Sequence, residues 1–169
     1  MSLKLTLQGG LIYAAMAGYF AALLCHFVRR ERRFGRAFHF VGFVFAALGL
    51  AYRGYHTGHV PLQNMFEVFL CLGMLSWPLS VFCRTVLGVD SEKIDILIGL
   101  IVLFPAGLVF SAEPQKLPPA LQSWLFAPHV TAYMLAYIVL LKATFQSIIR
   151  LWGHQDKPAS GQSIHRMIK

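Results

Sequence analysis

Charged residues are scarce in this chain, in which 15 Lys and Arg and 7 Asp and Glu make up 13% of 169 residues. A soluble domain carries about a quarter charged residues, so this composition excludes an ordinary soluble domain. Hydrophobic residues make up 57% and the mean hydropathy is +0.60. The chain is long enough for a few membrane spans of about 20 residues each. We therefore interpret it as a single membrane domain.

Cysteine is also scarce, and its placement excludes two redox classes. The three cysteines, Cys25, Cys71 and Cys83, all lie inside apolar runs. They form neither a C-x-x-C pair nor a C-x-x-C-H haem-attachment motif. The pattern is typical of buried free thiols, and it argues against a thiol oxidoreductase and against a c-type cytochrome.

Apolar runs predict an all-α integral membrane protein with about five transmembrane helices. The third run contains Pro78, which predicts a kink, and the fourth is interrupted by Pro105. The tail of residues 150–169 is polar. The predicted spans are residues 7–28, 37–52, 65–87, 94–110 and 124–149.

Basic residues predict how these spans are oriented. The sequence RRERRFGR places five arginines directly after the first span, whereas a cleaved signal peptide carries its charge before the apolar core. We therefore expect an uncleaved first helix. With the N-terminus outside and the tail in the cytoplasm, only Lys4, Arg53 and Lys116 of the 15 basic residues lie outside, leaving twelve inside. The basic excess is thus a topology signal and does not indicate nucleic-acid binding.

Two polar stretches, residues 53–69 and 117–133, interrupt the apolar sequence and share the predicted outer face. In the first, Asn64 and Glu67 have the spacing of a helix cap with its reciprocal acid, and Pro61 marks the turn before it. Alternatively, Glu67 pairs with Arg53 or orients a ligand, because an acid at the edge of a span is a candidate functional residue.

Histidines and aromatic residues in the same stretches are candidate haem-binding residues. His56 and His59 are spaced i, i+3 in an expected loop and are weak candidates for metal ligands. His129 lies near the outer end of the fifth span, and Tyr133 and Tyr137 follow it on one helix face. We expect this face to turn inward, toward protein, water or a cofactor, because an imidazole facing lipid is costly.

Three other residues leave alternatives open. Trp124 fits an aromatic anchor at the membrane interface, and it is also a candidate cofactor contact. His26 and His39 lie at the cytoplasmic ends of the first two spans. As a pair they allow a different hypothesis, in which the chain is the haem b or quinone membrane anchor of a redox complex.

The two stretches together resemble one known family. PLQNMFEVF resembles the P-L-x-N-x-x-E segment of the CcsA/ResC-type cytochrome c biogenesis proteins of System II, and LPPALQSWLFAPHVTAYMLAY resembles a later segment of the same proteins. The resemblance covers about residues 53–141. It implies haem presentation on the outer membrane face for attachment to apocytochrome c, with His129 as an axial ligand to haem iron. Four further residues inherit only the status of motif positions: Pro61, Asn64, Glu67 and Gln122.

One family feature is missing from the sequence. Nothing in residues 138–169 resembles the tryptophan-rich W-G-x-x-W-x-W-D haem-binding loop. We therefore expect either one half of a split protein or a truncated relative. In the first case the chain binds haem transiently and forms part of a cytochrome c synthase without being catalytic alone. Its implied partners are a protein carrying the missing loop, a ResB/CcsB-type membrane protein and apocytochrome c, in a bacterial cytoplasmic membrane. The alternative is a non-catalytic assembly scaffold.

Overall fold

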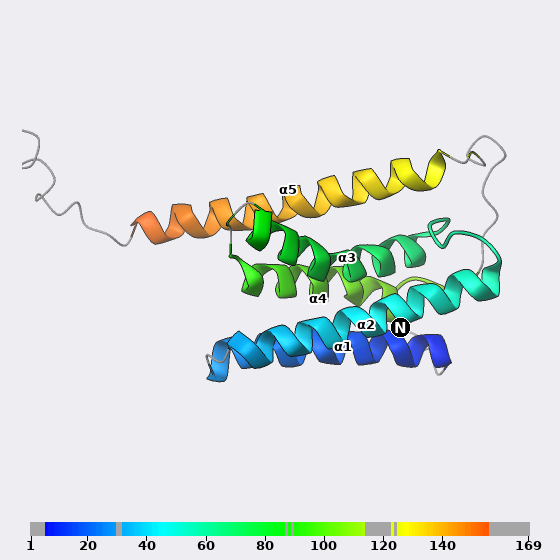
Figure 1. The fold of residues 1–169 in the computed structure, drawn as a ribbon, viewed down its shortest axis with the longest axis horizontal. Coiled ribbons are helices and arrows are strands. Elements are labelled where there is room, and N and C mark those ends of the chain that lie inside the picture. The colour runs from blue at the N-terminus through cyan, green and yellow to red at the C-terminus, as the bar shows by residue number, and fades with distance from the viewer. Residues whose placement is uncertain are drawn as a thin grey trace, which may run out of the picture.

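The computed structural model describes residues 6–29, 32–86, 88, 90–113, 123 and 125–155, and within these it is helical with no strand (Figure 1). The five α-helices and one π-helical turn, η1, follow the chain in this order: α1 (Leu7–Leu24), η1 (Cys25–Arg29), α2 (Arg32–Thr57), α3 (Met65–Val86), α4 (Glu92–Leu108) and α5 (Phe126–Gln155). The predicted all-α class is confirmed, and each of the five predicted spans corresponds to one of these helices.

Four of these helices are long and apolar enough to cross a membrane: Leu7–Val28, Arg32–Thr57, Met65–Val86 and Phe126–Ile149. The fourth helix in the chain, α4, has 17 residues, which at about 1.5 Å per residue gives about 25 Å. This length is at the lower limit for a span. Helix α4 nevertheless packs alongside α3 within the bundle (Figure 1). The chain is therefore an integral membrane protein.

Helix boundaries differ from the predicted ones chiefly at α2 and α5. Helix α2 covers residues 32–57 instead of 37–52, and α5 continues to residue 155, into the segment assigned to the polar tail. The reason is that hydropathy marks the part of a helix that lies in the bilayer, whereas backbone hydrogen bonds carry a helix on through polar residues. Helices α3 and α4 also continue through Pro78 and Pro105, so Pro105 does not break its span.

The helices run alternately up and down the long axis of the molecule, so that α1 begins at one end and α5 finishes at the other (Figure 1). Helix α1 packs mainly on α2, and α3 packs mainly on α4. Helix α5 lies over α3 and α4 and is less buried than the other spans. The α2–α3 connection, the chain leaving α4 and the beginning of α5 all lie at one end (Figure 1).

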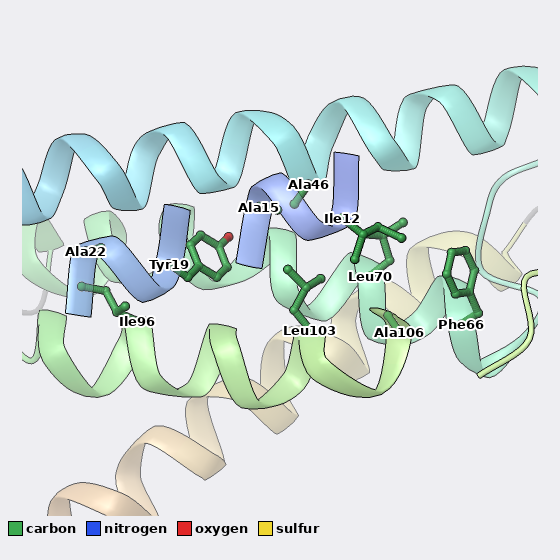
Figure 2. Close-up of a cluster of buried hydrophobic side chains, with 10 residues drawn as sticks. All are labelled: Ile12, Ala15, Tyr19, Ala22, Ala46, Phe66, Leu70, Ile96, Leu103 and Ala106. Atoms are coloured by element: carbon green, nitrogen blue, oxygen red, sulfur yellow. The ribbon is translucent and has the colours of Figure 1, made fainter. Parts of the chain in front are cut away.

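The core lies where α1 to α4 meet, and Figure 2 shows its buried side chains pointing into the space between these helices. Its members are Ile12, Ala15, Tyr19, Ala22, Ala46, Phe66, Leu70, Ile96, Leu103 and Ala106. Helices α1 and α2 approach most closely at two glycines, since a Cβ added at Gly18 would lie 2.9 Å from the Cα of Gly42. Small residues at such crossings let membrane helices pack closely.

Candidate functional site

A buried ion pair joins α2 to α3 at the end where the two polar stretches lie. Arg53 Nε donates to Glu67 Oε1 at 2.8 Å. Arg53 is 5% exposed and Glu67 is 0% exposed. The guanidinium also lies over the ring of Phe66, 5.5 Å from its centroid. Of the two alternatives for Glu67, pairing with Arg53 is therefore present in the structure.

The expected helix cap is present as well, at the start of α3. The backbone N–H of Glu67 donates to Asn64 Oδ1 at 2.9 Å. The reciprocal bond runs from the backbone N–H of Gln63 to Glu67 Oε2 at 2.7 Å, one residue earlier than in the usual capping box. Each carboxylate oxygen of Glu67 thus has its own donor, and the same acid serves both the cap and the ion pair.

Side chains of the first stretch also bind the backbone that leads toward the second. Arg53 Nη1 donates to the carbonyl of Ala112, and Asn64 Nδ2 donates to the carbonyl of Glu113 at 3.0 Å. The remaining nitrogen, Arg53 Nη2, is buried and has no partner among the described residues. Arg53 and Asn64 therefore fix the start of the α4–α5 connection against the start of α3.

His59 lies in the turn before this cap, whereas His56 lies in the last turn of α2 and not in the loop predicted for it. Gly58 adopts a positive φ of 69°, which glycine tolerates without strain. His59 Nδ1 lies 3.0 Å from the carbonyl of Val60, while His56 is exposed and its ring centroid lies 4.2 Å from that of Tyr52. The described residues contain no group of three or more His, Cys, Asp or Glu that could hold a metal ion.

Pro61 packs against the end of α2. A Cβ added at Gly54 would lie 3.4 Å from Pro61 Cδ, so the proline ring rests on the backbone of the helix where it has no side chain. This contact holds the turn against α2. Two candidate residues of the second stretch, Gln122 and Trp124, lie outside the described residues.

His129 lies in the first turn of α5 and is exposed. Its ring meets the edge of Tyr133 at 4.6 Å between centroids, and Tyr133 lies 6.3 Å from Tyr137 in a stacked arrangement. No hydrogen bond to the ring nitrogens of His129 comes from any residue that the structure describes. Both nitrogens are thus accessible for a ligand.

This face of α5 does not turn toward the described part of the bundle, so the prediction is wrong for contact with this chain, while a turn toward water or a cofactor stays a prediction. Tyr133 is 50% exposed and Tyr137 is 63% exposed. The face that packs on the bundle carries Met134, Ile138 and Lys142 instead, and these side chains are buried. The i, i+4 spacing correctly groups residues on a face, but which face is buried depends on how the helix is rotated against its neighbours.

A second buried ion pair, between α4 and α5, was not predicted from the sequence. Lys142 Nζ lies 2.9 Å from Asp95 Oδ1 and 3.0 Å from Oδ2, and both side chains are 5% exposed. From the sequence, Lys142 was predicted only to be one of the basic residues of the cytoplasmic face. The sequence feature that could have predicted this pair is the presence of an acid and a lysine inside predicted spans. Charged residues at such depths usually pair with each other.

His26 and His39, the alternative haem b pair, line different cavities. His39 is buried, its ring meets the edge of Tyr19 at 5.2 Å, and its Nε2 lies 3.5 Å from Ser76 Oγ. His26 occupies the space beside Gly35, where a Cβ would come 2.5 Å from its Nε2. These contacts lend no support to a haem held between the two residues.

Seven curated relatives match the chain, and all are named cytochrome c biogenesis protein CcsA. The one from Prochlorococcus marinus (strain MIT 9515) is 30% identical over 145 residues, which is 81% of this chain and 45% of the relative. The one from Cycas taitungensis is 35% identical over 106 residues, 57% of this chain and 32% of the relative. The one from Welwitschia mirabilis is 30% identical over 121 residues, 67% of this chain and 39% of the relative.

The chain spans less than half the length of these relatives. No family model matches it, and no solved structure matches it. The similarity agrees with the resemblance drawn from its two polar segments. The chain is similar to a part of the CcsA cytochrome c biogenesis proteins.

Proposed function

We propose that the chain is a membrane component of cytochrome c biogenesis that takes part in handling haem at the end of the bundle where its two polar stretches meet. The name that the relatives share supports a role in cytochrome c biogenesis. The observation that carries the finer proposal is the pair of hydrogen bonds from Arg53 and Asn64 to the carbonyls of Ala112 and Glu113. These bonds hold the chain that leaves α4, and that leads toward the second CcsA-like segment, against the first segment at one end of the bundle.

His129 is the residue that would bind haem iron at this end. It is exposed, its ring nitrogens have no partner among the described residues, and its ring is steadied by the edge of Tyr133. An imidazole with an accessible nitrogen fits an axial haem ligand. Haem, when bound, supplies the iron for this ligation and the vinyl groups that become joined to the cysteine thiols of apocytochrome c.

The remaining residues of the site hold the polypeptide in position. Arg53, Glu67 and Asn64 fix the connection that leads to α5, and α5 carries His129. A single imidazole holds haem weakly by itself. The proposal therefore includes a second polypeptide that provides the tryptophan-rich loop and another axial ligand, a ResB/CcsB-type membrane partner, and an outward orientation of this end in a bacterial cytoplasmic membrane.

Haem titration of the purified protein in detergent tests the ligand assignment. We expect the haem absorption of the wild type to be largely lost in His129→Ala and to be restored when free imidazole is added. His56→Ala is the matched control, because His56 is also exposed and lies in the last turn of α2, next to the α2–α3 connection. Unchanged haem binding by His129→Ala, or an equal loss in His56→Ala, would contradict the assignment.

The same titration in the presence of a CcsA-like polypeptide that carries the tryptophan-rich loop tests the split-protein proposal. We expect tighter haem binding by the two chains together than by either chain alone. If the mixture binds no more haem than the sum of its parts, the split-protein proposal is wrong while the His129 assignment can still stand.

A further inference from the structure

A cavity of about 650 Å³ lies at the opposite, arginine-rich end of the bundle, far from the site proposed for haem. Residues of η1, the start of α2, the α3–α4 connection, the start of α4 and the last turns of α5 line it. Its volume is in the range typical of sites for small organic ligands, roughly 300–1,000 Å³. It is therefore large enough for a phospholipid headgroup.

Two buried polar atoms at this cavity have no hydrogen-bond partner among the described residues. One is Nε2 of His26, a residue that is 4% exposed, and the other is Oγ of Ser91. His26 Nε2 lies 3.8 Å from Glu92 Oε1, too far for a hydrogen bond. Buried polar atoms are nearly always paired, so these two atoms point to a ligand with polar atoms of its own.

The start of α4 adds further donors at the same place. Ser91 is the N-cap residue of α4, yet its side chain makes no capping hydrogen bond. The first backbone N–H groups of a helix have no partner within the helix and favour an anion such as phosphate. In α4 the N–H groups of Ile94 and Asp95 donate to the carbonyl of Ser91, which leaves the N–H groups of Glu92 and Lys93 for a phosphate, together with Ser91 Oγ and the unpaired His26.

The charged side chains of the cavity are balanced in sign. Arg32 and Lys93 are basic, and Asp90 and Glu92 are acidic. Arg32 Nη1 lies 3.3 Å from Asp90 Oδ2. A lining with two charges of each sign matches a zwitterionic ligand better than an anion.

Apart from Gln146 and Gly88, the rest of the lining is apolar and lies on membrane-type helices. Ile94 and Leu97 lie one turn apart on α4, and Ile149 faces them from α5. Phe27 closes the side next to Lys93, whose Nζ lies 5.2 Å from the ring centroid. An acyl chain fits this wall, whereas a free soluble ion would leave it without a partner.

We propose that this cavity binds a phospholipid with an ethanolamine headgroup. Its phosphate accepts hydrogen bonds from Ser91, from the first N–H groups of α4 and from Lys93. Its ammonium group donates to Glu92 and to the lone pair of His26. The proposal does not depend on the haem function, because it concerns other residues at the other end of the bundle.

Lipid retention by the purified full chain tests the proposal. The protein is incubated in detergent micelles containing equal amounts of phosphatidylethanolamine, phosphatidylcholine and phosphatidylglycerol with the same acyl chains, and bound lipids are identified by native mass spectrometry. We expect phosphatidylethanolamine to be retained in preference to both others. Lys93→Gln and Ser91→Ala should each weaken this binding, by up to about tenfold for the loss of one strong hydrogen bond.

Arg33→Gln is the matched control, because Arg33 is exposed in the same basic cluster but does not line the cavity. It should leave the lipid preference unchanged. Equal retention of the three lipids, a preference for phosphatidylglycerol, or an equal effect of Arg33→Gln and Lys93→Gln would overturn the proposal. Displacement of the lipid by an equimolar amount of soluble glycerophosphoethanolamine would also overturn it, because the acyl wall would then contribute nothing.

Discussion

Replacing Glu67 with glutamine should destabilise the protein strongly, although the two side chains have nearly the same shape. Glutamine has one acceptor oxygen, whereas Glu67 receives Arg53 Nε on one oxygen and the backbone N–H of Gln63 on the other. In Glu67→Gln one of these donors faces an NH₂ group. At the same time the buried guanidinium of Arg53 loses its counter-charge.

The magnitude follows from burial. Arg53 is 5% exposed and Glu67 is 0% exposed, so solvent cannot replace the lost partner. Removing one member of such a buried pair costs about 3–5 kcal/mol of folding free energy. For a chain of this size this corresponds to a fall of about 6–20 °C in the unfolding temperature.

Thermal unfolding in detergent, followed by circular dichroism, measures this effect. Glu113→Gln is the matched control, because it is the same chemical change at an exposed side chain, in a residue whose carbonyl bonds to Asn64 at the same end of the bundle. It should change stability by less than about 0.5 kcal/mol. A double-mutant cycle with Arg53→Gln should show strong coupling, with the double variant less destabilised than the sum of the single variants. If Glu67→Gln melts within the range of Glu113→Gln, the claim that this pair holds the end of the bundle is refuted.

Two further changes test the packing of the bundle. Lys142→Met should lower the free energy of unfolding by about 3–5 kcal/mol, because it leaves the buried carboxylate of Asp95 without its counter-charge. The double change Asp95→Leu with Lys142→Met should recover much of that loss, and equal melting of the wild type and Lys142→Met would contradict this. Gly18→Ala should destabilise by about 1–3 kcal/mol, since its Cβ would lie 2.9 Å from the α2 backbone, whereas Gly10→Ala, with open space around it, should not destabilise α1. Chemical unfolding in detergent measures both glycine variants, and equal stability of the two would disprove the close contact.

Local sequence features predicted much of the end of the bundle that carries the candidate site. The N-cap of α3 was predicted from Asn64 and Glu67, because a cap involves residues only three positions apart. Pairing of Arg53 with Glu67 was an open alternative, since both residues flank one short connection. The carbonyls of Ala112 and Glu113 could not be assigned as acceptors, because they lie about 50 residues further along the chain.

The sequence by itself determined that this is an all-α membrane protein with five helices and two CcsA-like segments, because hydropathy and helix capping depend on neighbouring residues. Only the tertiary structure decided which face of α5 is buried, that Lys142 pairs with Asp95, and that His26 borders a cavity at the other end. These features depend on the rotation of each helix about its axis and on its depth against its neighbours. Packing between distant segments sets both quantities, and a residue pattern within one helix does not specify them.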